Sequence, residues 1–307
     1  MTKRFTGLGV ALITPFTEQG SIDFPALERM VHHVCGSKAH FLVVLGSTGE
    51  AQMMNPEEHR RVLDFVQEVN HGRLPLVAGF DTSGGTAAAV ARLGALDTTG
   101  IDGLLMSAPA YVKPGQAGLV AHFKALSAVS PLPIILYNVP SRTGVAMAPE
   151  TIIEIATTCP QVVALKQADD NLADFRQIKA DVPDSFVMLS GDDANAIPMM
   201  ALGGSGLVSV IGNAYPDDWA EAMDLGLFGS VKEAEQRLTR HQPLLDVLFA
   251  EGNPTGIKAV CDLLGLCGPH PRLPLMPATK AHRDTLYRAM AELDAVPQRT
   301  ETESADS

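Results

Sequence analysis

The chain has 307 residues, of which 46% are hydrophobic and 19% charged, a balance typical of a globular protein with a real core. Its formal net charge of −12 argues against a nucleic-acid or anionic-membrane partner. The four cysteines are scattered and show no CxxC spacing, which argues against a disulfide framework. No apolar stretch approaches the ~20 residues needed to cross a bilayer, and no signal-peptide pattern is present. We therefore expect a cytoplasmic protein.

Eight short apolar runs follow one another along the chain and predict buried strands. Each run is rich in branched side chains and apolar throughout, as in parallel strands that are covered on both faces. The runs occupy residues 8–14, 40–46, 74–80, 102–108, 132–138, 161–167, 185–191 and 206–212. Segments with helical periodicity lie between them. The clearest starts with Asn55, Pro56 and Glu58, a capping-box pattern with proline at the first helical position.

This alternation predicts the architecture. Eight strand–helix repeats over roughly 220 residues favour a parallel (β/α)8 TIM barrel, which we place at 1–226. A doubly wound open sheet is the alternative, but the GxGxxG turn that it favours is missing. A C-terminal module of three amphipathic helices is predicted at 227–296, followed by a disordered tail at 297–307. The three helices are predicted within 230–250, 253–266 and 277–295.

Lys166 is the sharpest candidate for chemistry. The active sites of such barrels lie at the carboxyl ends of the strands, and Lys166 directly follows the apolar residues 162–165. Burial there favours a neutral amine, which can attack a carbonyl and form a Schiff base. The alternative is a lysine at the rim that reaches solvent or pairs with a carboxylate.

Other predicted strands end in a phenol, hydroxyls and a guanidinium. Tyr137 ends the neighbouring strand and could relay protons, or could simply pack at the rim. Ser47 and Thr48 lie between glycines, so their hydroxyls and amides could hold a carboxylate; a plain turn is the alternative. Arg142 follows Tyr137 closely and could bind an anion.

Two further segments have simpler explanations than ligand binding. Asp192 and Asp193 precede a helical segment and are interpreted as a capping pair rather than as metal ligands. The "GGSG" segment at 203–206 precedes a strand, so tight packing is favoured over a phosphate cradle. The histidines form no HExxH pattern. The sequence thus predicts no metal site.

Together these motifs resemble the dihydrodipicolinate synthase / N-acetylneuraminate lyase family over residues 1–296. The matching stretches are "GVALITPF", "GSTGEA", "YNVPSRTG", "ALKQA", "LSGDDA", "GLVSVIGNAYP", "EGNPTGIKAVCDLLGL" and "RLPLMP". The resemblance implies a barrel with C-terminal helices, assembled as a homotetramer or homodimer. It also implies a Schiff base with pyruvate and no cofactor.

The resemblance implies roles for four catalytic residues. Lys166 would form the imine with pyruvate, and Tyr137 would be the proton-relaying phenol. Ser47 and Tyr111 would complete the relay, with Tyr111 reaching in from a neighbouring subunit. Ser47 stands where the synthases more often have threonine, but it keeps the hydroxyl.

The same resemblance implies four substrate-binding residues. Thr48 would hold the carboxylate of pyruvate, and Gly191 and Val208 would line the site through their backbones. Arg142 would bind the carboxylate of L-aspartate 4-semialdehyde, which implies a condensation in lysine and diaminopimelate biosynthesis. The alternatives are a family aldolase or dehydratase that acts on a sugar acid, and a catalytically silent paralogue that binds a keto acid.

Most polar groups of the family's lysine feedback site are replaced here, although His59 is retained. We therefore predict that L-lysine inhibits this protein weakly or not at all. A steady-state assay with increasing L-lysine measures this, and inhibition at micromolar concentrations would contradict it. The replacements are Ala51, Pro56, Ser83, Ala88 and Ala110.

Overall fold

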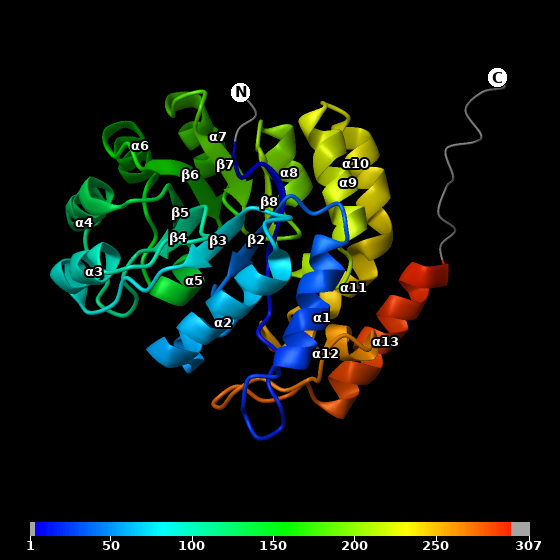
Figure 1. Cartoon of the computed structure of the whole chain (residues 1–307). Coiled ribbons are helices and arrows are strands. Elements are labelled where there is room, and N and C mark those ends of the chain that lie inside the picture. Colours follow the sequence, from blue (N-terminus) through cyan, green and yellow to red (C-terminus); the bar gives the residue numbers. More distant parts are fainter. Residues whose placement is uncertain (1–3, 296–307) are drawn as a thin grey trace.

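The computed structural model describes residues 4–295. Its centre is a closed barrel of eight parallel strands in sequence order, with helices around the outside (Figure 1). The predicted TIM barrel is therefore confirmed. Its strands are β1 (Gly7–Ala11), β2 (Phe41–Val44), β3 (Leu76–Gly79), β4 (Gly103–Ser107), β5 (Ile134–Asn138), β6 (Val162–Gln167), β7 (Val187–Ser190) and β8 (Gly206–Ser209).

Helices connect successive strands, as the sequence pattern predicts. The capping box at Asn55 is present: its side chain accepts from the Glu58 amide at 2.9 Å, and Glu58 Oε2 accepts from the Asn55 amide at 3.0 Å. Three short helices also occur in the connections. The longer helices are α1 (Phe24–Cys35), α2 (Pro56–Asn70), α3 (Gly85–Gly94), α4 (Gln116–Val129), α6 (Pro149–Thr158), α7 (Leu172–Asp181), α8 (Ala196–Ala201) and α9 (Pro216–Leu227); the short ones are η1 (Ala51–Met53), α5 (Pro140–Thr143) and η2 (Ile211–Asn213).

The C-terminal segment is helical but differs from the prediction in one respect. The first predicted helix, 230–250, is divided into three pieces, with Pro243 in the first turn of the last piece. Proline lacks an N–H group and so cannot continue the preceding helical hydrogen bonds. The division of the chain at residue 226 stays a prediction, and the predicted tail lies outside the described residues. The elements are α10 (Val231–Leu238), η3 (Thr239–His241), α11 (Gln242–Leu248), α12 (Thr255–Leu263) and α13 (Lys280–Ala295).

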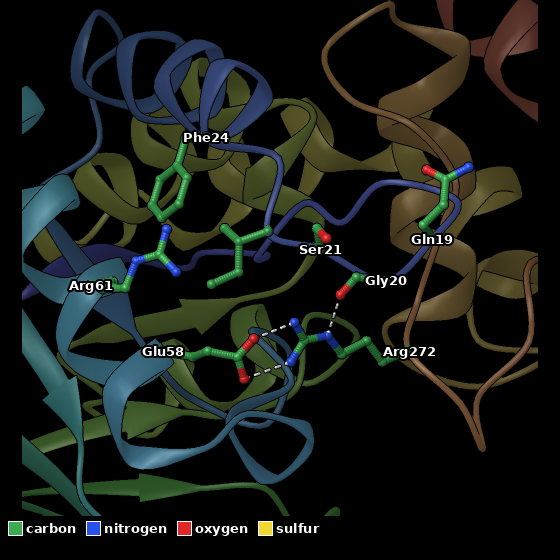
Figure 2. Close-up of a pocket in the computed structure, with 8 residues that line it drawn as sticks. Gln19, Gly20, Ser21, Phe24, Glu58, Arg61 and Arg272 are labelled. Atoms are coloured by element: carbon green, nitrogen blue, oxygen red, sulfur yellow. Dashed lines mark hydrogen bonds and ion pairs between the residues drawn. The ribbon is translucent and has the colours of Figure 1, made fainter.

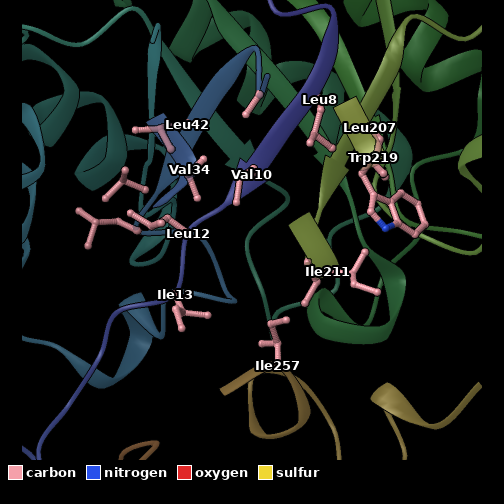
Figure 3. Packing of buried hydrophobic residues seen from close by; sticks show 14 of the residues in the cluster. Leu8, Val10, Leu12, Ile13, Val34, Leu42, Leu207, Ile211, Trp219 and Ile257 are labelled. Atoms are coloured by element: carbon pink, nitrogen blue, oxygen red, sulfur yellow. The ribbon is translucent and has the colours of Figure 1, made fainter. Parts of the chain in front are cut away.

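Both faces of the barrel strands are covered by apolar side chains. Along β2, Leu42 belongs to the outer cluster between barrel and helices, whereas Val43 belongs to the cluster inside the barrel. Figure 3 shows Leu42 with Val34 of α1, and Leu207 of β8 with Trp219 of α9, in the outer cluster. This two-sided burial explains why the strands are apolar throughout rather than alternating.

The "GGSG" segment packs as the sequence suggests. Gly206 begins β8 with φ +145°, and a Cβ there would lie 2.0 Å from the carbonyl oxygen of Gly7. Glycine is therefore needed where β8 closes the barrel against β1.

A buried ion pair joins α12 to the loop after β2. Lys258 and Glu50 are 0% and 2% exposed, and Lys258 Nζ lies 2.5 Å from Glu50 Oε1. Lys258 Nζ also donates to the His270 carbonyl at 3.0 Å and lies 4.3 Å from the ring centroid of Phe16. Burial lowers the pKa of Lys258. Both charges are out of water, so each depends on the other.

Arg272 extends this contact toward α2. Its guanidinium donates to the Glu58 carboxylate at 2.9 and 2.5 Å and to the Gly20 carbonyl at 2.8 Å, as Figure 2 shows. Its amide donates to Glu50 Oε2 at 2.8 Å. The hydrogen bonds from Arg272 hold the pKa of Glu58 at about 2. Arg272 and Glu58 also line a cleft of about 420 Å³ beside Arg61.

Replacing Lys258 should be strongly destabilising. In Lys258→Met the Glu50 carboxylate stays buried without its cation, which costs about 3–5 kcal/mol of unfolding free energy. The double variant Glu50→Gln/Lys258→Met leaves no buried charge and should recover much of that loss. Urea unfolding of both variants measures the difference. A single variant within about 1 kcal/mol of wild type would contradict this role.

Candidate functional site

Tyr137 and Lys166 lie side by side at the carboxyl ends of β5 and β6. The two residues are direct partners in the strand register. Tyr137 belongs to the cluster inside the barrel, and so does Ala164, two residues before Lys166 on the same strand face. Tyr137 is 8% exposed and Lys166 is 4% exposed. Lys166 Nζ lies 4.2 Å from the centroid of the Tyr137 ring.

This geometry excludes one alternative for Lys166, a side chain that reaches solvent. A rim lysine that reaches solvent would be exposed, whereas this amine lies inside the barrel against a phenol. A desolvated amine next to an acid–base group is the arrangement that Schiff-base chemistry requires. The structure thus brings together the two residues on which the predicted chemistry depends.

Gly191 and Val208 complete the inner wall. Gly191 directly follows β7, and a Cβ there would lie 3.0 Å from both Cγ and Cε of Lys166 and 2.8 Å from Ala168 Cβ. Val208 is fully buried in the same inner cluster as Tyr137. The space around the lysine stem is therefore set by a residue without a side chain.

The loop after β2 carries Ser47 and Thr48 at the same rim. Thr48 is 3% exposed, and its Oγ1 accepts a hydrogen bond from Asn253 Nδ2 at 2.9 Å. Ser47 is half-buried. Thr14 Oγ1 donates to the Gly49 carbonyl at 2.7 Å, which fixes the far side of the loop to the segment after β1.

Arg142 and Tyr111 lie farther out. Arg142 is exposed in α5, directly after β5, and its Nη2 donates to the Asn253 carbonyl at 3.4 Å. The Tyr111 amide donates to the Thr143 carbonyl at 3.3 Å, so Tyr111 lies beside the same short helix. Its side chain is 94% exposed and is not part of the buried site of its own chain. The role of Tyr111 across a subunit contact stays a prediction.

The capping prediction for Asp192 and Asp193 is wrong for α8. The residue that precedes α8 is Asn195, and no side chain caps this helix. Asp193 is buried, and it accepts from Ser209 Oγ at 2.6 Å and from the amides of Val210 and Ile211 at 3.1 and 3.2 Å. It therefore fixes the end of β8. Burial raises the pKa of Asp193 to about 6, although these hydrogen bonds act against the rise.

Sequence reasoning missed Asn253 as well as this role of Asp193. Asn253 lies between α11 and α12 and contacts both Thr48 and Arg142. Its partner Thr48 is 205 residues away in the sequence, so no local pattern could indicate the contact. Gln167, next to Lys166, accepts at its Oε1 from Asn138 Nδ2 at 3.1 Å.

Residues 4–295 meet the requirements neither of a metal site nor of a membrane-spanning helix. No group of three or more His, Cys, Asp or Glu side chains in this range could hold a metal ion. None of the helices in the described part of the chain is long and apolar enough to span a membrane.

Fold and site together define a TIM barrel whose carboxyl rim carries a buried lysine against a tyrosine. The model of the Dihydrodipicolinate synthetase family matches residues 4–293. The chain belongs to this family of enzymes, and the family resemblance found in the sequence is confirmed.

Curated relatives and solved structures agree with this assignment. A 4-hydroxy-tetrahydrodipicolinate synthase of Phocaeicola vulgatus is 39% identical over 274 residues, which cover 89% of this chain and 92% of the relative. One of Escherichia coli is 39% identical over 287 residues, 93% of this chain and 98% of the relative. The crystal structure of a chloride-inhibited dihydrodipicolinate synthase of Acinetobacter baumannii with pyruvate has a TM-score of 0.90 and 32% identity, and covers 95% of this chain and 99% of that one.

A side chain at Gly191 should disturb Lys166. In Gly191→Ala the added methyl group would lie 3.0 Å from Lys166 Cγ and Cε, so the lysine stem has to move. We expect the rate of imine formation to fall by roughly 100-fold, because small displacements of a reacting group are costly. Borohydride trapping with pyruvate measures this rate. A rate within twofold of wild type, in a variant with an unchanged melting temperature, would contradict the crowding argument.

Proposed function

We propose that this chain condenses pyruvate with L-aspartate 4-semialdehyde to 4-hydroxy-tetrahydrodipicolinate, through a Schiff base on Lys166. The observation that carries the proposal is the buried Lys166 amine against the Tyr137 ring, in a chain of this family. The name of the curated relatives supports the choice of reaction.

The first half of the reaction uses the buried part of the site. The Lys166 amine, once deprotonated, attacks the ketone carbon of pyruvate, and the carbinolamine loses water to give an imine. Loss of a proton from the pyruvate methyl group then gives an enamine. Tyr137 moves protons in these steps, with Ser47 and a partner's tyrosine at the position of Tyr111 completing the relay. Thr48 holds the pyruvate carboxylate beside Gly191 and Val208.

The second half needs the outer part of the site. The enamine carbon attacks the aldehyde carbon of the semialdehyde and forms the new carbon–carbon bond. The amine of the semialdehyde then attacks the imine carbon, closes the ring and releases Lys166. Arg142 binds the carboxylate of the semialdehyde, because its planar guanidinium can donate two parallel hydrogen bonds. One water is released in total, and no redox step occurs.

We also propose that the protein acts as a homotetramer or homodimer in the cytoplasm. Tyr111 and Val112 are 94% and 68% exposed, and large apolar side chains of this kind are enriched where chains meet. An interface at this point would also bring the phenol of Tyr111 to a neighbouring site. A sugar-acid aldolase or dehydratase would share Lys166 and Tyr137 but has no need of Arg142 in this role. A silent paralogue has no need of a buried reactive lysine.

The proposal is tested with wild type, Lys166→Arg and Arg142→Ala. Wild type should form product from both substrates and give a borohydride-stable pyruvate adduct on Lys166. Lys166→Arg should give neither, because a guanidinium does not form the imine. Arg142→Ala should keep the adduct but lose about 10- to 100-fold in kcat/KM for the semialdehyde, the range expected for charge-assisted hydrogen bonds.

Mass mapping of the trapped peptide and a coupled assay provide the two measurements. A wild-type protein without an adduct on Lys166 would exclude every Schiff-base mechanism. Turnover of sialic acid or 2-keto-3-deoxygluconate in preference to the semialdehyde would favour the sugar-acid alternative.

A further inference from the structure

Asn253 is the residue through which the C-terminal helices contact both predicted carboxylate-binding groups. It lies in the turn between α11 and α12, outside the barrel strands. Its side-chain Nδ2 donates to Thr48 Oγ1 at 2.9 Å, and its main-chain carbonyl accepts from Arg142 Nη2 at 3.4 Å. One residue thus contacts the buried donor and the exposed donor of the proposed site.

The contact with Thr48 fixes the direction of a proton. With Nδ2 placed toward Thr48, Thr48 Oγ1 accepts, because a carboxamide nitrogen only donates; Asn253 Oδ1 is buried without a hydrogen-bond partner among residues 4–295. The single hydrogen of the Thr48 hydroxyl is then left to donate elsewhere. A carboxylate has acceptors only. Asn253 therefore presets the Thr48 hydroxyl as a donor toward the carboxylate of a keto acid.

The contact with Arg142 restrains a flexible side chain. Arg142 is exposed, and a free arginine loses much rotamer freedom when it binds a ligand. The Asn253 carbonyl occupies one of its five N–H donors and leaves the others for a carboxylate. The Arg142 side chain is therefore partly ordered before the second substrate binds, so it loses less conformational entropy on binding.

The turn that carries Asn253 is itself held in place. The Gly256 amide donates to the Gly252 carbonyl at 3.2 Å, and the Lys258 amide donates to the Pro254 carbonyl at 2.9 Å. Lys258 forms the buried ion pair with Glu50, two residues after Thr48. The loop after β2 is therefore attached to the C-terminal helices at two neighbouring points, one of which is Asn253.

We propose that Asn253 is a positioning residue for both substrates: it directs the Thr48 hydroxyl toward the first carboxylate and holds Arg142 ready for the second. The inference rests on the proposed function. It assigns the two contacts to different parts of one residue: the Asn253 side chain serves the first substrate through Thr48, and its main-chain carbonyl serves the second through Arg142.

Asn253→Ala and Asn253→Asp test the proposal against Thr255→Val. Thr255 is the first residue of α12, two residues after Asn253, and donates to the Met276 carbonyl at 3.1 Å; within the described residues no hydrogen bond joins it to Thr48 or Arg142, so it is a matched control. In Asn253→Ala the pyruvate concentration for half-maximal borohydride trapping should rise about five- to tenfold, the range for one hydrogen bond. Alanine keeps the main-chain carbonyl that accepts from Arg142, so the KM for the semialdehyde should stay within about twofold of wild type, with kcat within about threefold.

Asn253→Asp should weaken pyruvate binding more than Asn253→Ala does. A carboxylate at this position accepts from Thr48, which turns the hydroxyl hydrogen away from pyruvate and adds a negative charge beside it. This isosteric variant also provides the test if Asn253→Ala does not fold. Thr255→Val should leave both constants unchanged.

The inference is wrong if the folded Asn253 variants keep the pyruvate constant within twofold of wild type, if their KM for the semialdehyde rises as much as the pyruvate constant, or if Thr255→Val shifts the pyruvate constant equally. These outcomes are separate from a failure of the proposed function. That failure shows in wild type, as a missing Lys166 adduct or missing product, whereas the present inference is read from variants of a wild type that shows both.

Discussion

The ion pair between Glu50 and Lys258 determines how the loop after β2 is held. Both charged groups are buried, so separating them would leave an uncompensated charge in a medium of low dielectric. Glu50 lies two residues after Thr48, and Lys258 lies five residues after Asn253, which contacts Thr48 directly. The Arg272 amide adds a hydrogen bond to the same carboxylate. The C-terminal helices are therefore part of the proposed substrate site and not only a covering of the barrel.

The register of the barrel imposes the second constraint. Because Tyr137 and Lys166 are direct partners on neighbouring parallel strands, their side chains point into the barrel at the same level. Gly191 follows the next strand and leaves the room that the lysine stem occupies. Asp193 then holds the end of β8 through Ser209 and two amides. The Lys166 amine is thus positioned by a regular strand that is paired on both sides.

The sequence predicts the barrel and the Lys–Tyr pair because both follow from local pattern. Eight apolar runs define the strands, and a lysine and a tyrosine that end two of these runs must meet at one rim. Asn253 and Asp193 could not be found in this way. Their partners lie 205 and 16 to 18 residues away, and the contacts exist only after the chain has folded. The break in the helix predicted at 230–250 is different, because Pro243 was visible in the sequence as a helix-breaking signal.

In the proposed site, the chemistry and the choice of second substrate are separated by depth. Lys166 and Thr48 are 4% and 3% exposed, so an imine and its enamine would form largely away from bulk water, which protects the reactive carbon from protonation. Arg142 is exposed at the mouth and is restrained by a main-chain carbonyl. An inner site that activates a keto acid can serve many acceptors, whereas an outer guanidinium favours those with a carboxylate. Replacing Arg142 should therefore change which second substrate is used without changing the chemistry at Lys166. Asn253 contacts both levels of the site, Thr48 in the inner part and Arg142 at the mouth.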